Sequence, residues 1–228
     1  MGKEVEKAAI ARGHEIVFTI DNETDWQKFY SKPVKADVAI DFSMPSVAVY
    51  NMVAFFKLGI PVIIGTTGWD EKYEEVKEIC LKNKSAFMYS SNFSIGVNLL
   101  FSLNTKLAEM MKTLDQYDVS IEEIHHLQKL DSPSGTAITL ANQIISKIDR
   151  KKKWVNKKSS INNFLEIKSV RKDNIVGIHH VIYTSENDEL SISHNAKNRS
   201  GFAIGAVMAA EWIQGETGVF TMNDMLNL

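Results

Sequence analysis

The first ninety residues alternate short, nearly continuous apolar runs with longer stretches whose apolar positions recur at helical spacing. The apolar runs cover residues 15–20, 37–42, 60–64 and 86–89. Runs of this length are typical of strands that are buried on both faces of a parallel sheet. The helical stretches cover residues 2–12, 46–58 and 71–83. Pro45 precedes the second stretch, where proline suits a first helical turn. The alternation predicts a Rossmann-type, doubly wound α/β domain.

Small or polar residues follow each of these predicted strands. The clusters are Asp21-Asn22, Asp41-Phe42-Ser43, Gly65-Thr66-Thr67-Gly68 and Ser90-Ser91-Asn92-Phe93. Ligands of open parallel sheets bind in the crevice outside the carboxyl ends of the strands, so the clusters predict a cofactor crevice along one edge. Two interpretations of Asp41 stay open, a residue that lines the crevice or a cap for the helix that follows.

The pattern changes after residue 94 and predicts a second, α+β domain. We expect helices over 99–114, 136–148 and 202–214, and strands over 117–124, 164–171, 175–184 and 189–195. The strands alternate apolar and polar residues, which suits a sheet with one polar face. We expect a dinucleotide-binding domain over 1–94, a substrate-binding and tetramerisation domain over 95–201, and a return of the chain to the first domain over 202–228.

The start of the chain departs from the usual dinucleotide-binding pattern. Such a fold opens with a strand and a glycine-rich turn before its first helix. This chain starts at Met1-Gly2-Lys3, where the first helix is already predicted. We therefore expect the first strand to be missing from the parallel sheet and dinucleotide binding to be weakened.

Composition and charge argue against several classes of protein. The net charge of −2 offers no electrostatic footprint for nucleic acid or for an anionic membrane. We interpret the basic run Lys151-Lys152-Lys153 as a solvated loop, because no aromatic stacking platform accompanies it. We expect no signal sequence and no membrane span, and the single cysteine, Cys80, cannot form an intramolecular disulfide. We expect a cytoplasmic protein.

Residues 122–136 contain the highest concentration of candidate catalytic and binding side chains in the sequence. A predicted strand ends at His125-His126, Lys129 follows, and Ser134-Gly135-Thr136 opens a helix. Neighbouring strand residues point to opposite faces, so the two histidines are not expected to share a metal ion. The free amides and the dipole at the helix start form a seat for a carboxylate. A histidine and a lysine beside that seat indicate proton donation to an anionic substrate. The alternative is a packed histidine pair with an ordinary helix cap.

The same stretch resembles the signature of dihydrodipicolinate reductases, Glu-x-His-His-x-x-Lys-x-Asp-(Ala/Ser)-Pro-Ser-Gly-Thr-Ala, read here from Glu123 to Ala137. Four further segments are similar to parts of that family, namely residues 64–68, 91–98, 194–199 and 218–226. The resemblance implies an oxidoreductase of lysine and diaminopimelate synthesis. Its members reduce 4-hydroxy-tetrahydrodipicolinate to tetrahydrodipicolinate with NADH or NADPH, as homotetramers.

The resemblance also implies roles for single residues, without a metal ion. His125 and Lys129 would donate the proton. The dicarboxylate substrate would be held by His126, Ser134, Gly135, Thr136 and Arg199. The cofactor would contact Asp21, Asn22, Gly65, Thr66, Thr67, Ser90, Ser91, Asn92 and Phe93. Asp21 suits the hydroxyls of the adenine ribose, and its alternative is a surface turn. Asn22 stands where members often have an arginine for the 2′-phosphate, which favours NADH or the use of both cofactors.

One alternative to the reductase and one further histidine pair remain to be considered. The absent glycine-rich turn leaves open a catalytically silent binding or assembly protein on the same scaffold. A second histidine pair, His179-His180, is interpreted as one packed and one exposed side chain of a strand.

Overall fold

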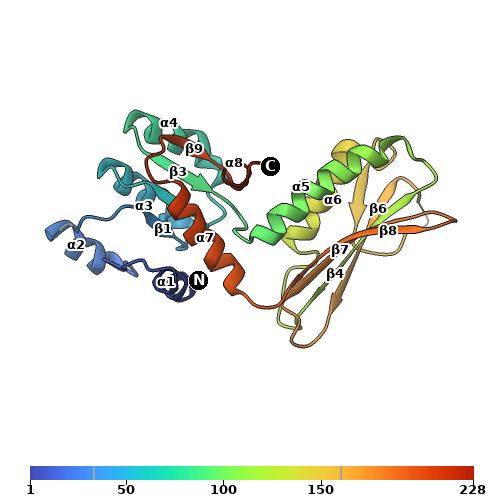
Figure 1. Ribbon diagram of the computed structural model, residues 1–228, viewed down its shortest axis with the longest axis horizontal. Coiled ribbons are helices and arrows are strands. Elements are labelled where there is room, and N and C mark those ends of the chain that lie inside the picture. The colour runs from blue at the N-terminus through green and yellow to red at the C-terminus, as the bar shows by residue number, and fades with distance from the viewer. Residues whose placement is uncertain (33, 160) are drawn as a thin grey trace. The chain divides into compact units, whose positions relative to one another are not determined.

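The computed structural model describes residues 1–32, 34–159 and 161–228, and the chain divides into two compact units (Figure 1). Unit 1 comprises Met1–Ile95 and Ser200–Leu228, and unit 2 comprises Gly96–Arg199. The chain thus leaves unit 1 once and returns to it. None of the helices in the described ranges is long and apolar enough to cross a membrane.

Unit 1 contains a four-stranded parallel sheet in the order β1-β2-β3-β9. Its strands are β1 (Ala39–Asp41), β2 (Val62–Ile64), β3 (Ala86–Tyr89) and β9 (Gly218–Phe220). The side chains of Ile63, Ile64 and Phe87 are fully buried. This burial on both faces explains why the central strands appear as continuous apolar runs in the sequence.

Helices cover both faces of this sheet. They are α1 (Gly2–Ala11), α2 (Glu23–Ser31), α3 (Pro45–Lys57), α4 (Tyr73–Lys82, preceded by the 3-10 turn η1, Asp70–Lys72), α7 (Ser200–Trp212) and α8 (Met222–Leu226). Helices α3 and α4 pack against the face that carries Ile64 and Phe87. Helix α7 packs against the face that carries Ile63 and Met88. Since adjacent strand residues point to opposite faces, the domain is doubly wound as predicted.

The predicted strand over residues 15–20 is wrong, because these residues form no strand. A strand needs a neighbouring ladder for its backbone groups, and the described residues provide none beside this segment. Two of its apolar side chains, Phe18 and Ile20, instead pack against Trp26 and Phe29. Those aromatic residues belong to α2, a helix that the apolar pattern did not predict.

Unit 2 contains a five-stranded mixed sheet in the order β5-β6-β4-β7-β8. Its strands are β4 (Asp118–His125), β5 (Lys153–Val155), β6 (Phe164–Arg171), β7 (Gly177–Thr184) and β8 (Glu189–Ala196). Strand β4 pairs in parallel with β6 and antiparallel with β7. Helices α5 (Ile95–Met110, followed by the 3-10 turn η2, Met111–Thr113) and α6 (Gly135–Lys147) complete the unit. The core of unit 2 joins Leu140 and Ile144 of α6 to Ile121, Val181 and Tyr183 of the sheet.

The interpretation of the basic run as a solvated loop is wrong for its first residue, which is buried, and for its last, which begins β5. Lys151 is 2% exposed, while Lys152 and Lys153 are exposed. A buried ammonium group needs acceptors, and the Nζ of Lys151 donates to the carbonyl oxygens of Asn162 (2.7 Å) and Phe164 (2.9 Å). Lys151 therefore joins two segments of the chain and contributes no binding surface.

Gly205 allows α7 to lie directly against the backbone of unit 1. A Cβ atom at Gly205 would lie 1.8 Å from the carbonyl oxygen of Phe93. No side chain fits at that distance, so the glycine is required by the close approach. Gly201, in the same helix, has no atom within 4 Å of the corresponding position.

We predict opposite effects of alanine at these two glycines. Gly205→Ala should destabilise unit 1 by about 1–3 kcal/mol or more, because the helix must move away from Phe93. Gly201→Ala should leave stability unchanged or raise it by up to about 1 kcal/mol, because alanine favours the helix. Thermal and urea unfolding of both variants checks this pair. Equal stabilities of the two variants would contradict the described contact.

Candidate active site

Strand β4 brings Glu123 and His125 to one face, because residues two apart on a strand point the same way. Glu123 is 0% exposed and His125 is 7% exposed. The Oε2 atom of Glu123 lies 2.9 Å from Nδ1 of His125. Its Oε1 atom accepts hydrogen bonds from the backbone N–H of Ser134 (3.2 Å) and from Nη2 of Arg171 (3.1 Å). One buried carboxylate thus touches a histidine, the start of α6 and a guanidinium group.

The charge of Glu123 is maintained by these contacts. Burial alone would raise the pKa of Glu123, but its contacts with His125, Ser134 and Arg171 hold that pKa well below its usual range. A buried charge is tolerated when it is paired and hydrogen-bonded, as here. Glu123 is therefore ionised at neutral pH.

His179 supports the same cluster from the neighbouring strand. The β4–β7 register places it opposite Glu123. Its Nε2 lies 3.1 Å from Oγ of Ser134, and its ring lies edge-on to that of His125 with centroids 5.1 Å apart. Burial, together with the charge of His125, lowers the pKa of His179 to about 3, so its imidazole is neutral. His180, next to it, is half-buried and not exposed, so the predicted division into one packed and one exposed histidine is right for His179 only.

Ser134 begins α6 as its N-cap, as the sequence predicted. Its Oγ accepts the N–H of Ala137 at 3.2 Å. The N–H groups of Gly135 and Thr136 have no acceptor within the described part of the chain. Two free amides at the positive end of a helix can bind a carboxylate. The seat therefore adjoins the Glu123–His125 pair through Ser134.

The predicted catalytic residue Lys129 and the predicted substrate residues His126 and Arg199 have partners outside this cluster. The Nζ of Lys129 lies 2.7 and 2.8 Å from the two carboxylate oxygens of Asp131. The Nη2 of Arg199 lies 3.2 Å from Nε2 of His126. His125 and His126 thus have different neighbours, as adjacent strand residues should. Lys129 is held by Asp131 and, among the described residues, makes no hydrogen bond or ion pair with His125, so its role in proton donation stays a prediction.

In unit 1, Asp41 ties together the ends of β1 and β2 and the helix α3. Its Oδ1 accepts from the N–H of Ser43 (2.8 Å) and from Oγ1 of Thr66 (2.9 Å). Its Oδ2 accepts from Nδ2 of Asn51 at 2.7 Å. The N-cap of α3 is Met44, not Asp41. Of the two interpretations of Asp41, the helix cap is excluded.

The ends of β2 and β3 place most of the predicted cofactor residues at one edge of the parallel sheet. Gly65 packs under the ring of Phe42, where a Cβ atom would lie 2.0 Å from Cε1. Thr66 is buried and Thr67 is exposed. After β3, the structure shows an exposed Ser91, a buried Phe93, and a hydrogen bond of 2.8 Å from Oγ of Ser90 to the carbonyl oxygen of Asn92.

Asp21 and Asn22 do not follow a strand, so this part of the prediction is wrong. Both are exposed at the start of α2. Asn22 is the N-cap of α2, and its side-chain oxygen accepts the N–H of Asp25 at 3.2 Å. The backbone N–H of Asp21 donates to the carboxylate of Asp25. The carboxylate of Asp21 and the amide nitrogen of Asn22 are the groups left to contact a nucleotide.

Family comparison covers both units. The family described as "Dihydrodipicolinate reductase, N-terminus" matches residues 1–93, and "Dihydrodipicolinate reductase, C-terminus" matches residues 96–226. The chain belongs to the dihydrodipicolinate reductase family. The resemblance noted in the signature is thereby confirmed along nearly the whole sequence.

Curated relatives and a solved structure agree with this assignment. A 4-hydroxy-tetrahydrodipicolinate reductase of Christiangramia forsetii is 49% identical over 227 residues, covering 100% of this chain and 94% of the relative. One of Buchnera aphidicola subsp. Schizaphis graminum is 38% identical over 200 residues, covering 83% of this chain and 72% of the relative. A dipicolinate-bound dihydrodipicolinate reductase from Paenisporosarcina sp. TG-14 has the same fold, with a TM-score of 0.77 and 22% identity over 96% of this chain and 92% of that one.

Sequence reasoning missed Glu123 and Arg171 as members of the site. Glu123 lies two residues before His125 on the same strand, so period-2 alternation could have placed the two together. Arg171 lies opposite His125 because of the β4–β6 register. No pattern in the sequence indicates that register.

Glu123, His125 and His179 offer metal-ligand atoms within 4.8 Å of one another, so together they could hold a metal ion. The guanidinium of Arg171 already binds the carboxylate and adds a positive charge. We therefore interpret the cluster as a hydrogen-bonding network. The absence of a metal stays a prediction.

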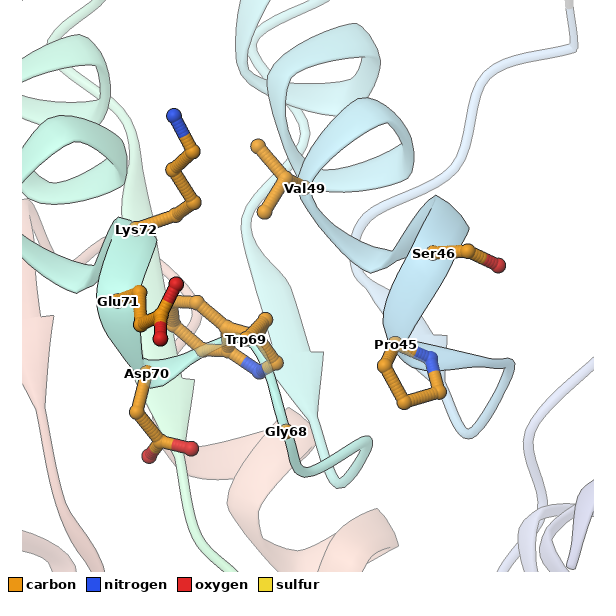
Figure 2. Close-up of a pocket in the computed structure, with 8 residues that line it drawn as sticks. All are labelled: Pro45, Ser46, Val49, Gly68, Trp69, Asp70, Glu71 and Lys72. Carbon is orange, nitrogen blue, oxygen red and sulfur yellow. The ribbon is translucent and has the colours of Figure 1, made fainter.

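A hollow in unit 1 lies between the start of α3 and the η1–α4 segment. Figure 2 shows the Trp69 ring at its floor, between Pro45 and Val49 on one side and Glu71 on the other. Asp70 and Glu71 at its rim repel phosphate groups, and Lys72 pairs with Glu75 at 3.0 Å. We do not assign the hollow to the cofactor.

The environment of His179 predicts its behaviour with pH. His179 should stay neutral from pH 8 to 5 in the folded protein, since its pKa is lowered to about 3 from an ordinary 6.5. Below pH 6.5, His179 of the unfolded chain becomes protonated, whereas His179 of the folded protein stays neutral until the pH approaches 3. This contribution to stability is therefore complete above pH 6.5 and is lost as the pH falls toward 3. Histidine NMR with and without urea, with His179→Gln for assignment, checks this, and a folded-state midpoint near 6.5 would contradict it.

Proposed function

We propose that this protein reduces 4-hydroxy-tetrahydrodipicolinate to tetrahydrodipicolinate with NADH or NADPH, in lysine and diaminopimelate synthesis. Family membership and the 49% identical reductase support the activity. The observation that carries the proposal is the carboxylate seat at Gly135 and Thr136 beside the buried Glu123–His125 pair. A substrate bound by its carboxylate at that seat would lie next to a proton donor.

Binding of the dicarboxylate uses two groups of residues. The free N–H groups of Gly135 and Thr136 would bind one carboxylate, with Ser134 fixing the helix start. Arg199 and its neighbour His126 would bind the other. A guanidinium group can bind a carboxylate through two parallel hydrogen bonds, which also orients the substrate ring.

Side chains of the protein would protonate the substrate. The reaction adds a hydride and a proton to the substrate, while the elements of water leave. When bound, the nicotinamide cofactor supplies the hydride. His125, held by Glu123, and Lys129, held by Asp131, would supply the proton. Positioned acids of this kind contribute about 10²–10⁴-fold to the rate.

The edge of the parallel sheet in unit 1 fits the cofactor. The strand ends place Gly65–Thr67 and Ser90–Phe93 along one edge, where parallel sheets bind nucleotides. The buried Oδ1 of Asn51 at this edge has no hydrogen-bond partner among the residues that the structure describes. Asp21 would accept hydrogen bonds from the ribose hydroxyls and would repel a 2′-phosphate, and Asn22 carries no charge. We therefore propose that NADH serves at least as well as NADPH.

Assembly and compartment follow the family expectation. We propose a cytoplasmic homotetramer formed through the sheet of unit 2. Residues of β8 alternate between exposed and half-buried, with Leu190 43% exposed. Light scattering of the purified protein tests the tetramer.

The activity is tested by a coupled assay with freshly generated substrate, comparing NADH with NADPH. We expect turnover with both and no preference for NADPH above about tenfold, which corresponds to about 1.4 kcal/mol. A larger preference would show that another cation binds the 2′-phosphate. Absence of turnover with either cofactor would support the catalytically silent alternative.

Lys129→Ala should lower kcat by about 10²-fold or more, because the substrate would lose one positioned acid. His125→Gln should have a similar effect. Gln128→Ala, at the exposed neighbouring position, is the matched control and should keep wild-type kcat. Wild-type turnover in both Lys129→Ala and His125→Gln would refute the assignment of the proton donors.

Arg199→Lys should weaken binding of pyridine-2,6-dicarboxylate although it keeps the charge, because lysine lacks the planar fork. Arg199→Ala should weaken it further. Lys197→Ala, two residues earlier and exposed, serves as the control for a general loss of positive charge. Calorimetric titration gives the affinities, and equal affinities in wild type and Arg199→Ala would disprove the clamp.

A further inference from the structure

The two oxygens of Glu123 contact two different parts of the candidate active site. Oε2 lies 2.9 Å from Nδ1 of His125, the predicted proton donor. Oε1 accepts the backbone N–H of Ser134, the first residue of the carboxylate seat. The side chain is fully buried, so water cannot replace either contact. The carboxylate therefore sets the position of the acid relative to the seat.

The chemistry of a carboxylate determines which nitrogen of His125 is available. An ionised carboxylate only accepts hydrogen bonds, so Nδ1 of His125 must carry a proton toward it. Nε2 is then the nitrogen that can give a proton to substrate. Oε2 and Nδ1 are close but not aligned for a good hydrogen bond. Catalytic hydrogen bonds of ligand-free sites often tighten only when substrate binds.

The surroundings also limit how the His125 ring can turn. A Cβ atom at Gly177 would lie 3.0 Å from Nε2 of His125, so the glycine leaves room for that edge of the ring. The His179 ring lies against His125 from β7. His179 in turn bonds to Ser134. A turn of the His125 ring would therefore displace His179 and, through it, the start of the carboxylate seat.

We propose that Glu123 is a positioning residue that holds His125 with Nε2 toward the substrate and fixes its distance from the carboxylate seat at α6. This inference rests on the proposed reductase function and deepens it. Glu123 itself does not touch the substrate. It acts through His125 and Ser134, in the way that a buried carboxylate orients a catalytic histidine in hydrolases.

The charges around His125 come from several elements. Glu123 faces it from β4, Arg171 contacts that carboxylate from β6, and His179 lies against the ring from β7. The ion pair of Lys129 with Asp131 lies in the loop between β4 and α6. The only negative charge in contact with the His125 ring, within the described residues, is that of Glu123. Its removal should make the protonated ring less stable.

The variant Glu123→Gln tests the proposal because it keeps the shape and removes the charge. The amide oxygen should stay on the donors Ser134 and Arg171, so the amide N–H₂ group would face Nδ1 of His125. We expect kcat to fall by about 10²-fold or more. The alkaline limb of its pH dependence should move about one to two units lower. KM and the affinity for pyridine-2,6-dicarboxylate should change less than threefold.

The matched control is Glu122→Gln, one residue earlier on the same strand. Glu122 pairs with Lys168 at the partly exposed side of β4 and should show a wild-type pH profile. Glu123→Gln with wild-type kcat and pH profile would overturn the proposal. So would equal losses of kcat, dicarboxylate affinity and thermal stability with an unmoved pH profile, because that pattern marks a merely structural residue.

A second measurement uses the wild-type protein and does not depend on the variant folding. Long-range ¹H–¹⁵N NMR at alkaline pH reports which nitrogen of neutral His125 carries the proton, with His125→Gln for assignment. The proposal requires the proton on Nδ1, and a proton on Nε2 would overturn it. This result is independent of turnover, so failure of the reductase assay and failure of the positioning role are distinguishable.

Discussion

The buried negative charge of Glu123 is the constraint on which the candidate site depends. An ionised carboxylate at 0% exposure costs several kcal/mol unless other groups satisfy it. Its partners come from three places in unit 2: His125 on the same strand, Arg171 on β6 and the backbone N–H of Ser134, the N-cap of α6. Satisfying one charge therefore brings an acid and a carboxylate seat together. The free-energy cost of burying that charge explains why β4, β6 and the start of α6 come together around Glu123.

Unit 1 uses the same device at the end of its parallel sheet. Asp41 is buried at the carboxyl end of β1 and accepts hydrogen bonds from Ser43, Asn51 and Thr66. These bonds tie β1, the segment after β2 and α3 together at the edge that presents Gly65 and Thr67. In each unit a buried carboxylate holds together groups for which we propose a role in ligand binding. Such residues are harder to recognise in a sequence than the residues that they position.

Much of the fold could be predicted, because buried parallel strands and amphipathic helices leave regular apolar patterns. The segment 15–20 shows the limit: it has a strand's composition but no neighbouring strand in the described chain, and α2 forms beyond it. The signature from Glu123 to Ala137 singled out His125 and Ser134, which the structure places around Glu123, and their roles stay a prediction. It could not predict Arg171 or the contact of His179 with Ser134, since both depend on strand register. Lys151 was misjudged because its burial depends on carbonyl groups eleven and more residues away.

A crystal structure with pyridine-2,6-dicarboxylate bound tests the central claim most directly, namely that Glu123 sets the acid and the carboxylate seat together. The account predicts one ligand carboxylate within hydrogen-bond distance of the N–H groups of Gly135 and Thr136. It also predicts that Nε2 of His125 faces the ligand while Nδ1 stays on Glu123. A dicarboxylate bound away from the start of α6, or a His125 ring turned with Nδ1 toward the ligand, would contradict it.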